Sequence, residues 1–199
     1  MAKIITIAQT KGGVSKSTLT YFLYQYFNSL GSKVGILDLD IQQTITQLND
    51  RFDKELNMVK PKKTEKMHER DEDFIFVDTP PYRVGDSEKI FAQSDFVLIP
   101  VTPSYLDAMA TETIMEDLKK YKGIKYAAIM TQVRQGTSYN EQIKSVLTDM
   151  DLPLLNTIMH QRVAYSRGIL REDLKQEENS KAVNEIGAIA NEILTLMVA

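Results

Sequence analysis

Residues 11–18 decide the fold, and the sequence there reads Lys11-Gly12-Gly13-Val14-Ser15-Lys16-Ser17-Thr18. The apolar run at 4–8 directly before it is typical of a buried strand. Directly after it, apolar residues recur at the i, i+3, i+4, i+7 spacing of a helix, at Leu19, Phe22, Leu23, Tyr26, Phe27 and Leu30. A glycine-rich turn between a strand and a helix presents backbone N–H groups and a helix N-terminus to one point. The stretch therefore predicts a phosphate-binding loop.

The side chains of this loop fit nucleotide chemistry. Lys16 would neutralise charge on the β- and γ-phosphates of ATP, and the Ser17 hydroxyl would be a ligand for Mg²⁺. Two positions depart from the general pattern, because Thr10 and Ser15 stand where such loops have glycine. Glycine tolerates unusual φ/ψ angles, whereas serine is small and can donate a hydrogen bond. We expect nucleotide binding to survive at Ser15, and the effect of this serine to fall on the hydrolysis rate.

The composition is that of a globular protein. Of 199 residues, 43 % are hydrophobic and 26 % are charged, and no run of about 18 apolar residues predicts a transmembrane helix. We expect one domain over residues 1–199, with no N-terminal helix-turn-helix domain. The absence of cysteine fits a cytoplasmic protein and excludes an iron–sulfur cluster. Because the net charge is −3, any contact with DNA would have to come from a local basic patch.

Strand-like and helix-like segments alternate along the chain, which predicts parallel βαβ units and an α/β fold. We expect a mostly parallel twisted sheet with helices on both faces. The predicted strands lie at 3–9, 34–37, 74–77, 96–101, 124–130 and 154–159. The predicted helices lie at 17–30, 43–56, 86–93, 106–121, 139–149 and 180–197, and residues 60–73 read as a solvated connection.

Carboxylates follow two of the predicted strands, and ligands of open parallel sheets bind at that edge. Asp38 and Asp40 lie two residues apart, so their side chains point the same way and need a cation or hydrogen-bond donors beside them. Mg²⁺ and a nucleophilic water would meet that need; the alternative is that both carboxylates cap the next helix. A second apolar run closes on Asp78, which is typical of a Mg²⁺-binding carboxylate behind a phosphate loop.

Together these segments resemble the ParA/MinD superfamily of ATPases, whose deviant Walker A motif carries a second lysine where this chain has Lys11. The run 38–43 is similar to the family's D-x-D-P-Q segment, with Ile41 in place of proline, and 78–81 is similar to its D-[T/C]-P-P segment. The segment 101–107 resembles a V-x-P-S-x-x-D segment of short plasmid-partition ATPases. The resemblance covers nearly the whole chain.

The resemblance implies a role for each of these residues. Lys11 would reach across a dimer to the partner's bound nucleotide, as a catalytic residue together with Lys16. Asp38 would hold a Mg²⁺-bound water, and Asp40 would position the water that attacks the γ-phosphate. Asp78 would bind Mg²⁺ through water. The implied cofactors are ATP and Mg²⁺.

The resemblance also implies partners. We expect a homodimer on ATP binding, nonspecific DNA of the nucleoid, and a ParB-like adaptor that stimulates slow ATP hydrolysis. Two basic stretches are the candidate DNA contacts, and each has an alternative interpretation as a solvated helix face: Lys119, Lys120 and Lys122 in one, and Arg162, Arg167 and Arg171 in the other. The expected location is cytoplasmic and nucleoid-associated, and the expected cargo is a plasmid or another large body.

Two other functions remain open for the same fold. One is a MinD-like or other positioning ATPase that acts on a membrane or a protein scaffold. The other is a small-molecule ligase that transfers phosphate. Membrane-surface helices carry Lys or Arg beside their apolar face, whereas the terminal helix here carries Glu185 and Glu192 and the last basic residue is Lys181. We therefore expect no membrane partner.

Overall fold

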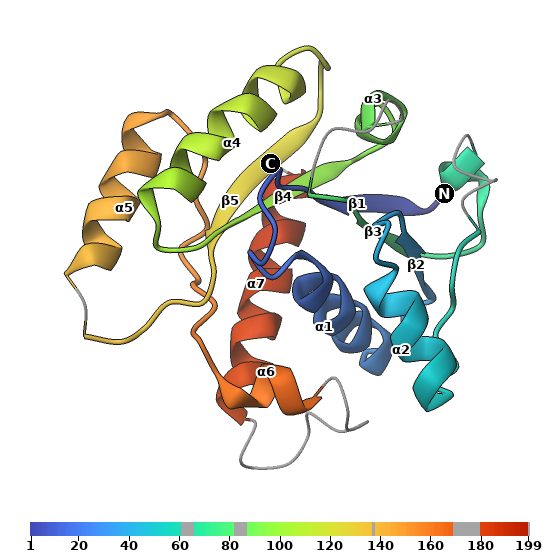
Figure 1. The fold of residues 1–199 in the computed structure, drawn as a ribbon. Helices are drawn as coiled ribbons and strands as arrows, with labels where there is room; N and C mark the ends of the chain where they lie inside the picture. Colours follow the sequence, from blue (N-terminus) through green and yellow to red (C-terminus); the bar gives the residue numbers. More distant parts are fainter. Residues whose placement is uncertain (61–65, 82–86, 137, 169–179, 199) are drawn as a thin grey trace.

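Five parallel strands form one sheet in the computed structural model, which describes residues 1–60, 66–81, 87–136, 138–168 and 180–198 (Figure 1). The sheet order is β2-β3-β1-β4-β5. The strands are β1 (Lys3–Ile7), β2 (Val34–Asp38), β3 (Phe74–Asp78), β4 (Phe96–Val101) and β5 (Lys125–Met130). Strand order reverses at β1, which pairs with β3 on one side and β4 on the other. The loop after β1 therefore leaves the carboxyl edge of the sheet at its topological switch point.

Helices cover both faces of the sheet, which confirms the predicted fold class. They are α1 (Lys16–Ser29), α2 (Thr44–Phe52), α3 (Ser87–Phe91), α4 (Tyr105–Leu118), α5 (Tyr139–Asp149), α6 (Val163–Gly168) and α7 (Ser180–Val198). α1 ends in a glycine motif: Gly31 has φ 87°, its N–H donates to Asn28, and the N–H of Ser32 donates to Phe27.

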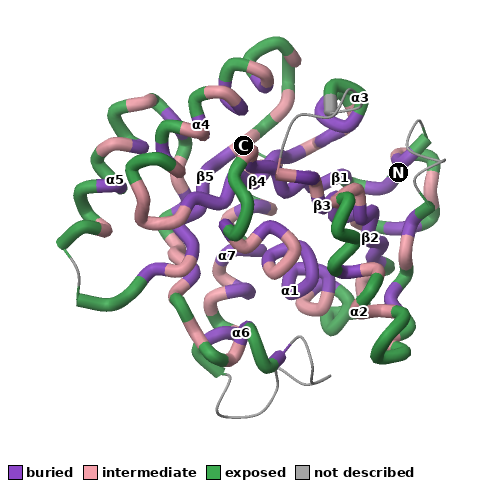
Figure 2. The backbone as a smooth tube through the Cα atoms, viewed as in Figure 1, coloured by how far each residue is buried: buried purple, intermediate pink, exposed green. Residues whose placement is uncertain are grey.

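Alternate residues of each strand belong to two separate hydrophobic layers, one on each face of the sheet. Ile5, Phe76 and Leu98 point to the face where α1 and α7 pack, in one cluster with Phe22 and Ile186. Their neighbours along the strands point to the other face, under α3, α4 and α5. Figure 2 shows the strands and most of α1 as buried. Because both faces are covered, the strand sequences are continuously apolar and do not alternate with polar residues.

An extended segment covers each edge of the sheet. These segments pair with the edge of the sheet through isolated β-bridges. Residues 57–59 run beside β2, where the N–H of Val59 donates to Ile36 at 2.7 Å. Residues 153–160 run beside β5 in the same way. The predicted strand at 154–159 is therefore wrong: Leu154 makes an isolated bridge to Ala128, the following His160 makes one to Val133, and no continuous ladder forms. Covered edges have few free backbone groups for pairing with another chain.

Two further expectations need correction. The helix predicted at 43–56 ends at Phe52, because Asp53 adopts a left-handed conformation with φ 48°. Within the connection predicted to be solvated, Met67 is fully buried. In the part of the chain that the structure describes, no helix is both long and apolar enough to cross a membrane.

Candidate functional site

The loop between β1 and α1 has the backbone shape that phosphate binding requires. Gly13 and Ser15 adopt left-handed conformations with φ 76° and φ 75°, and α1 begins at the next residue. Such alternation turns successive N–H groups toward one concavity, where they meet the positive end of the helix. A Cβ atom at Gly13 would meet nothing within 4 Å, so its glycine reflects backbone conformation and open space for a ligand.

The two lysines of the loop lie in different surroundings. Lys16 is buried, and its Nζ donates to the carbonyl oxygen of Lys11 at 3.0 Å. Burial lowers the pKa of Lys16, while the charges of Asp78 and Asp40 act in the opposite direction. Lys11 is exposed at the rim of the loop. Lys16 is therefore held inside the loop, and Lys11 is accessible from outside it.

Asp78 ends β3 beside the loop and is the most unusual group of the site. Its side chain is 0 % exposed, and neither carboxylate oxygen accepts a hydrogen bond from the described residues. Burial raises the pKa of Asp78 to about 7, and the nearby Ser17 hydroxyl and Lys16 charge offset this rise only in part. A buried carboxylate without partners destabilises a fold until a cation or an added donor satisfies it. Asp78 is the carboxylate best suited to Mg²⁺ or its bound water.

Asp38 is the last residue of β2, Asp40 follows two residues later, and both carboxylates already accept hydrogen bonds from the backbone. Asp38 accepts the N–H and the hydroxyl of Thr46, both at 3.0 Å, so it caps the start of α2. Asp40 accepts the N–H of Gln42 at 2.9 Å. Capping, the alternative interpretation of this pair, is thus observed at Asp38. It leaves room for a metal-bound water, because a carboxylate has about four acceptor sites.

The arrangement of oxygens fits Mg²⁺. The described residues contain no group of three His, Cys, Asp or Glu side chains that could hold a metal ion by itself. Mg²⁺ does not need one, because it keeps several waters and is held by one or two protein oxygens together with substrate phosphates. The hydroxyl of Ser17 and the unpartnered carboxylate of Asp78 supply such oxygens, with Asp38 near enough to influence the pKa of Asp78.

Two polar residues after β5 also contact the loop, and the sequence reasoning missed both. Thr131 donates its hydroxyl to the carbonyl oxygen of Val14 at 3.1 Å. Gln132 donates from Nε2 to the carbonyl oxygen of Gly13 and to the hydroxyl of Ser15, the latter at 3.0 Å. Both are polar residues directly after a buried strand. The same pattern identified Asp78, so it could also have identified Thr131 and Gln132.

A hollow of about 260 Å³ opens beside the loop. Ser15 and Thr18 form one wall, and Gln132 and the segment 159–166 form the others, through Met159, His160, Gln161, Arg162, Tyr165 and Ser166. The hollow therefore adjoins two residues of the predicted phosphate loop, Ser15 and Thr18. Segment 159–166 contains Arg162 and the first four residues of α6, and it ends directly before Arg167.

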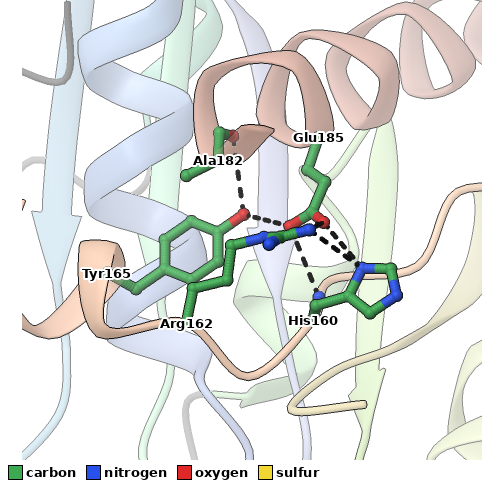
Figure 3. A network of polar contacts seen from close by, with 5 residues as sticks. All are labelled: His160, Arg162, Tyr165, Ala182 and Glu185. Atoms are coloured by element: carbon green, nitrogen blue, oxygen red, sulfur yellow. Dashed lines mark hydrogen bonds and ion pairs between the residues drawn. The ribbon is translucent and has the colours of Figure 1, made fainter. Parts of the chain in front are cut away.

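A polar network fixes that wall to α7 (Figure 3). Glu185 accepts hydrogen bonds from Arg162 at 3.0 Å and from Tyr165 at 2.7 Å, and it lies 2.6 Å from Nδ1 of His160. Burial alone would raise the pKa of Glu185, but the hydrogen bonds from Arg162, Tyr165 and His160 hold it below its usual value. Removing any partner would leave polar groups of the network unsatisfied, so it stabilises the position of α6.

The candidate DNA contacts divide into two separate places. Lys119, Lys120 and Lys122 lie between α4 and β5, at the amino edge of the sheet and away from the phosphate loop (Figure 1). Lys120 also pairs with Asp117 at 2.7 Å. Arg162 is bound to Glu185 and is 22 % exposed, whereas Arg167 is exposed on α6. Arg171 lies outside the described residues. None of these contacts is tested, and they stay predictions.

The sequence between residues 5 and 191 matches the family described as the CobQ/CobB/MinD/ParA nucleotide binding domain. The chain therefore belongs to this family, which confirms the resemblance inferred from residues 11–18, 38–43 and 78–81.

Two proteins are similar to this chain in sequence, and one solved structure is similar to it in fold. The chain is 26 % identical to the maintenance of carboxysome distribution protein A of Halothiobacillus neapolitanus, over 96 % of this chain and 95 % of that protein. It is also 26 % identical to the protein ParA of Rhizobium radiobacter, over 94 % and 91 % of the two chains. A plasmid partition protein of Borrelia burgdorferi bound to AMPPNP shares the fold, with a TM-score of 0.72, 20 % identity, and 97 % and 100 % coverage.

The burial of Asp78 predicts an effect of its amide replacement on stability. The folded-state pKa of Asp78 lies above the ordinary value of 3.8, so its charge destabilises the folded protein above about pH 7 and this penalty disappears in acid. We expect Asp78→Asn to stabilise the metal-free protein by about 1–2 kcal/mol above neutral pH, with a smaller gain at acidic pH. Thermal unfolding across a pH series measures this.

Magnesium supplies the control for this variant. The wild-type protein should gain thermal stability when Mg²⁺ and a nucleotide are added together, and Asp78→Asn should lose most of that gain. Asp71→Asn, an exposed aspartate outside the site, should behave as wild type. An Asp78→Asn protein that is less stable without metal and still gains fully from Mg²⁺ would contradict the assignment.

Proposed function

We propose that this protein is a ParA-type ATPase that dimerises on binding ATP and Mg²⁺, binds nonspecific DNA as a dimer, and positions a plasmid or another cargo. A ParB-like adaptor would stimulate its slow hydrolysis and so release it from DNA. The protein would be cytoplasmic and associated with the nucleoid. Its relatives support the positioning role, because one is named for carboxysome distribution and another as ParA.

The observation that carries the proposal is the difference between the two lysines of the loop. Lys11 is exposed, whereas Lys16 is buried and its Nζ donates to the carbonyl oxygen of Lys11. In one subunit, Lys16 would serve as the cation at the phosphates, and the exposed Lys11 would be available to a second subunit. Across a dimer, each Lys11 would stabilise charge that develops on the partner's nucleotide, where a preorganised cation is most effective.

The surface around the loop supports closure of two subunits face to face. Three large apolar side chains are exposed in the connections that leave this carboxyl edge of the sheet: Ile41 after β2 is 69 % exposed, and Tyr105 and Leu106 at the start of α4 are 54 % and 69 % exposed. Apolar and aromatic side chains that are exposed near one edge are typical of a surface that becomes covered.

Within each subunit, different side chains would bind the nucleotide, orient the attacking water and hold Mg²⁺. Lys16 and the loop N–H groups would hold the β- and γ-phosphates, and the hollow beside Thr18 would hold the base and sugar. Asp40 would orient the attacking water, since among the described residues the N–H of Gln42 engages just one of its carboxylate oxygens. When bound at Ser17 and Asp78, Mg²⁺ would neutralise charge on the phosphate oxygens.

For DNA, α6 is the more suitable of the two basic stretches. Its exposed Arg167 lies in the last turn of the helix, directly after Ser166, which lines the hollow. A change of nucleotide state could therefore alter the position of α6, whereas Lys119 and Lys122 lie at the opposite edge of the sheet. Contacts of Arg and Lys with phosphate would be sequence-independent and sensitive to salt.

Two alternatives remain. A positioning ATPase acting on a protein scaffold would use the same loop and dimer without DNA, and a small-molecule ligase would use the hollow for a substrate. A membrane partner at α7 is disfavoured, because the apolar face of this helix, with Ile186, Ile189 and Ile193, is buried against the sheet and α1. Membrane anchoring needs such a face to be free.

Two variants test the nucleotide switch. Lys16→Ala should abolish ATP-dependent dimerisation, because it removes the buried cation at the phosphates. Asp40→Ala should keep ATP binding but lower turnover by at least about a hundredfold, so that the dimer accumulates. Light scattering after size-exclusion chromatography in ATP and Mg²⁺ measures the dimer, and phosphate release measures turnover. Lys144→Ala, at an exposed lysine on α5, is the matched control. Normal hydrolysis by Asp40→Ala would refute its assigned role.

Charge reversal tests the two basic stretches separately. We expect Arg167→Glu to weaken ATP-dependent binding to nonspecific duplex DNA by about tenfold and to lower the salt slope by about one or more. Lys119→Glu should leave binding nearly unchanged. Arg162 is unsuitable for this test, because its removal would also leave Glu185 without its main partner. If Lys119→Glu has the larger effect, the DNA surface lies at the amino edge of the sheet instead.

A further inference from the structure

The structure places two left-handed, non-glycine residues opposite one another at the phosphate loop. Ser15 has φ 75° and Gln132 has φ 54°. L-residues other than glycine, asparagine and aspartate seldom adopt this conformation, and such residues persist where the surroundings determine them strongly. Ser15 precedes α1 and Gln132 follows Thr131 after β5, so the two come together only in the folded protein.

The side chains of this pair are in direct contact. Nε2 of Gln132 donates to the hydroxyl of Ser15 at 3.0 Å and also to the carbonyl oxygen of Gly13. The Ser15 hydroxyl makes no capping bond to α1, although Ser15 occupies the N-cap position. The hydroxyl that could cap the helix is instead turned toward Gln132.

The chemistry fixes which end of the glutamine faces the loop. A backbone carbonyl only accepts hydrogen bonds, so the group opposite Gly13 must be a donor, and the amide nitrogen of Gln132 is the donor that the side chain offers. A single glutamine thus holds loop residues 13 and 15, and its neighbour Thr131 holds Val14 between them. Three successive loop residues are therefore fixed from the end of β5.

We infer that Gln132 is a positioning residue, paired with Ser15, that holds the phosphate loop in its binding shape before the nucleotide arrives. The pair explains how a serine can stand where such loops have glycine. Glycine would adopt the left-handed conformation without strain, whereas serine adopts it here with its hydroxyl held by the glutamine. Binding a nucleotide to a loop that is already ordered loses less conformational entropy, so the pair increases affinity.

This inference rests on the proposed function only in that the loop binds ATP. Gln132 acts through the loop backbone. It also lines the hollow, beside Ser15. Its removal would therefore change affinity for nucleotide more than turnover of bound nucleotide. Removal of the Gln132 side chain should lower the affinity less when residue 15 is a glycine. A glycine needs no partner in order to keep this conformation.

A double-mutant cycle tests the pairing through the dissociation constant of a fluorescent ATP analogue in Mg²⁺. We expect Gln132→Ala to weaken binding by about tenfold when residue 15 is serine, which corresponds to the loss of two neutral hydrogen bonds. In the Ser15→Gly background the same change should weaken binding by at most about threefold. Gln142→Ala, an exposed glutamine on α5, is the matched control and should bind as wild type.

Hydrogen exchange of the nucleotide-free protein gives a second readout that needs no ATP. Gln132→Ala should speed exchange of the amides of the loop and the first turn of α1, without a general increase in the sheet. Equal losses of affinity in both backgrounds, or unchanged loop exchange, would overturn the pairing. A wild-type protein that binds no ATP while the loop exchange responds to Gln132→Ala would instead refute the proposed function and leave the pairing intact.

Discussion

The pairing of β1 between β3 and β4 is the constraint on which the rest of the site depends. All five strands are parallel, so their carboxyl ends share one edge, and β1 delivers the phosphate loop to the middle of that edge. Its neighbour β3 ends in Asp78, and β2 beyond it ends in Asp38. The sheet register thus brings together an ammonium group and carboxylates that lie far apart in the sequence. Among them, Asp78 is a buried carboxylate without a hydrogen-bond partner in the described residues, which favours the binding of a complementary cation.

That edge connects to α6 through a continuous set of contacts. Gln132 holds the loop, and two residues further on Arg134 donates to Gln161 at 2.7 Å. Gln161 belongs to the segment that walls the hollow and leads into α6, where Tyr165 reaches Glu185 of α7. A ligand that fills the hollow would therefore press on the segment that carries Arg167. Such a route would link nucleotide state to a distant surface, as a switch of the proposed kind requires.

The sequence was sufficient for the elements whose signals are local. The glycine turn at residues 11–18, the buried strand before Asp78 and the helix at 139–149 each follow from spacing and residue type alone. It was insufficient where tertiary contacts decide. Residues 154–159 are apolar enough for a strand, but they form one isolated bridge with β5, between Leu154 and Ala128, and no continuous ladder. The end of α2 depends on one left-handed residue, Asp53, with no glycine to indicate it.

The candidate site shows the same division. Lys16 and Asp78 could be placed from their motifs, because the chemistry at each position admits few residue types. Gln132 could not, since its role depends on a serine that lies more than a hundred positions away. Arg162 is the opposite case: its position in a basic stretch indicated DNA, whereas Glu185 on a separate helix holds its guanidinium within the protein. Pairing across elements is not visible in a single sequence.

The most direct test of the account is the binding of the wild-type protein to nonspecific duplex DNA without nucleotide, with ADP, and with ATP and Mg²⁺, across a series of salt concentrations. A ParA-type switch should bind DNA only with ATP and Mg²⁺, and this binding should fall steeply as salt rises because phosphate contacts release counterions. A protein that dimerises with ATP but binds no DNA in any nucleotide state would contradict it, and would favour a protein scaffold or a small molecule as the partner of this site.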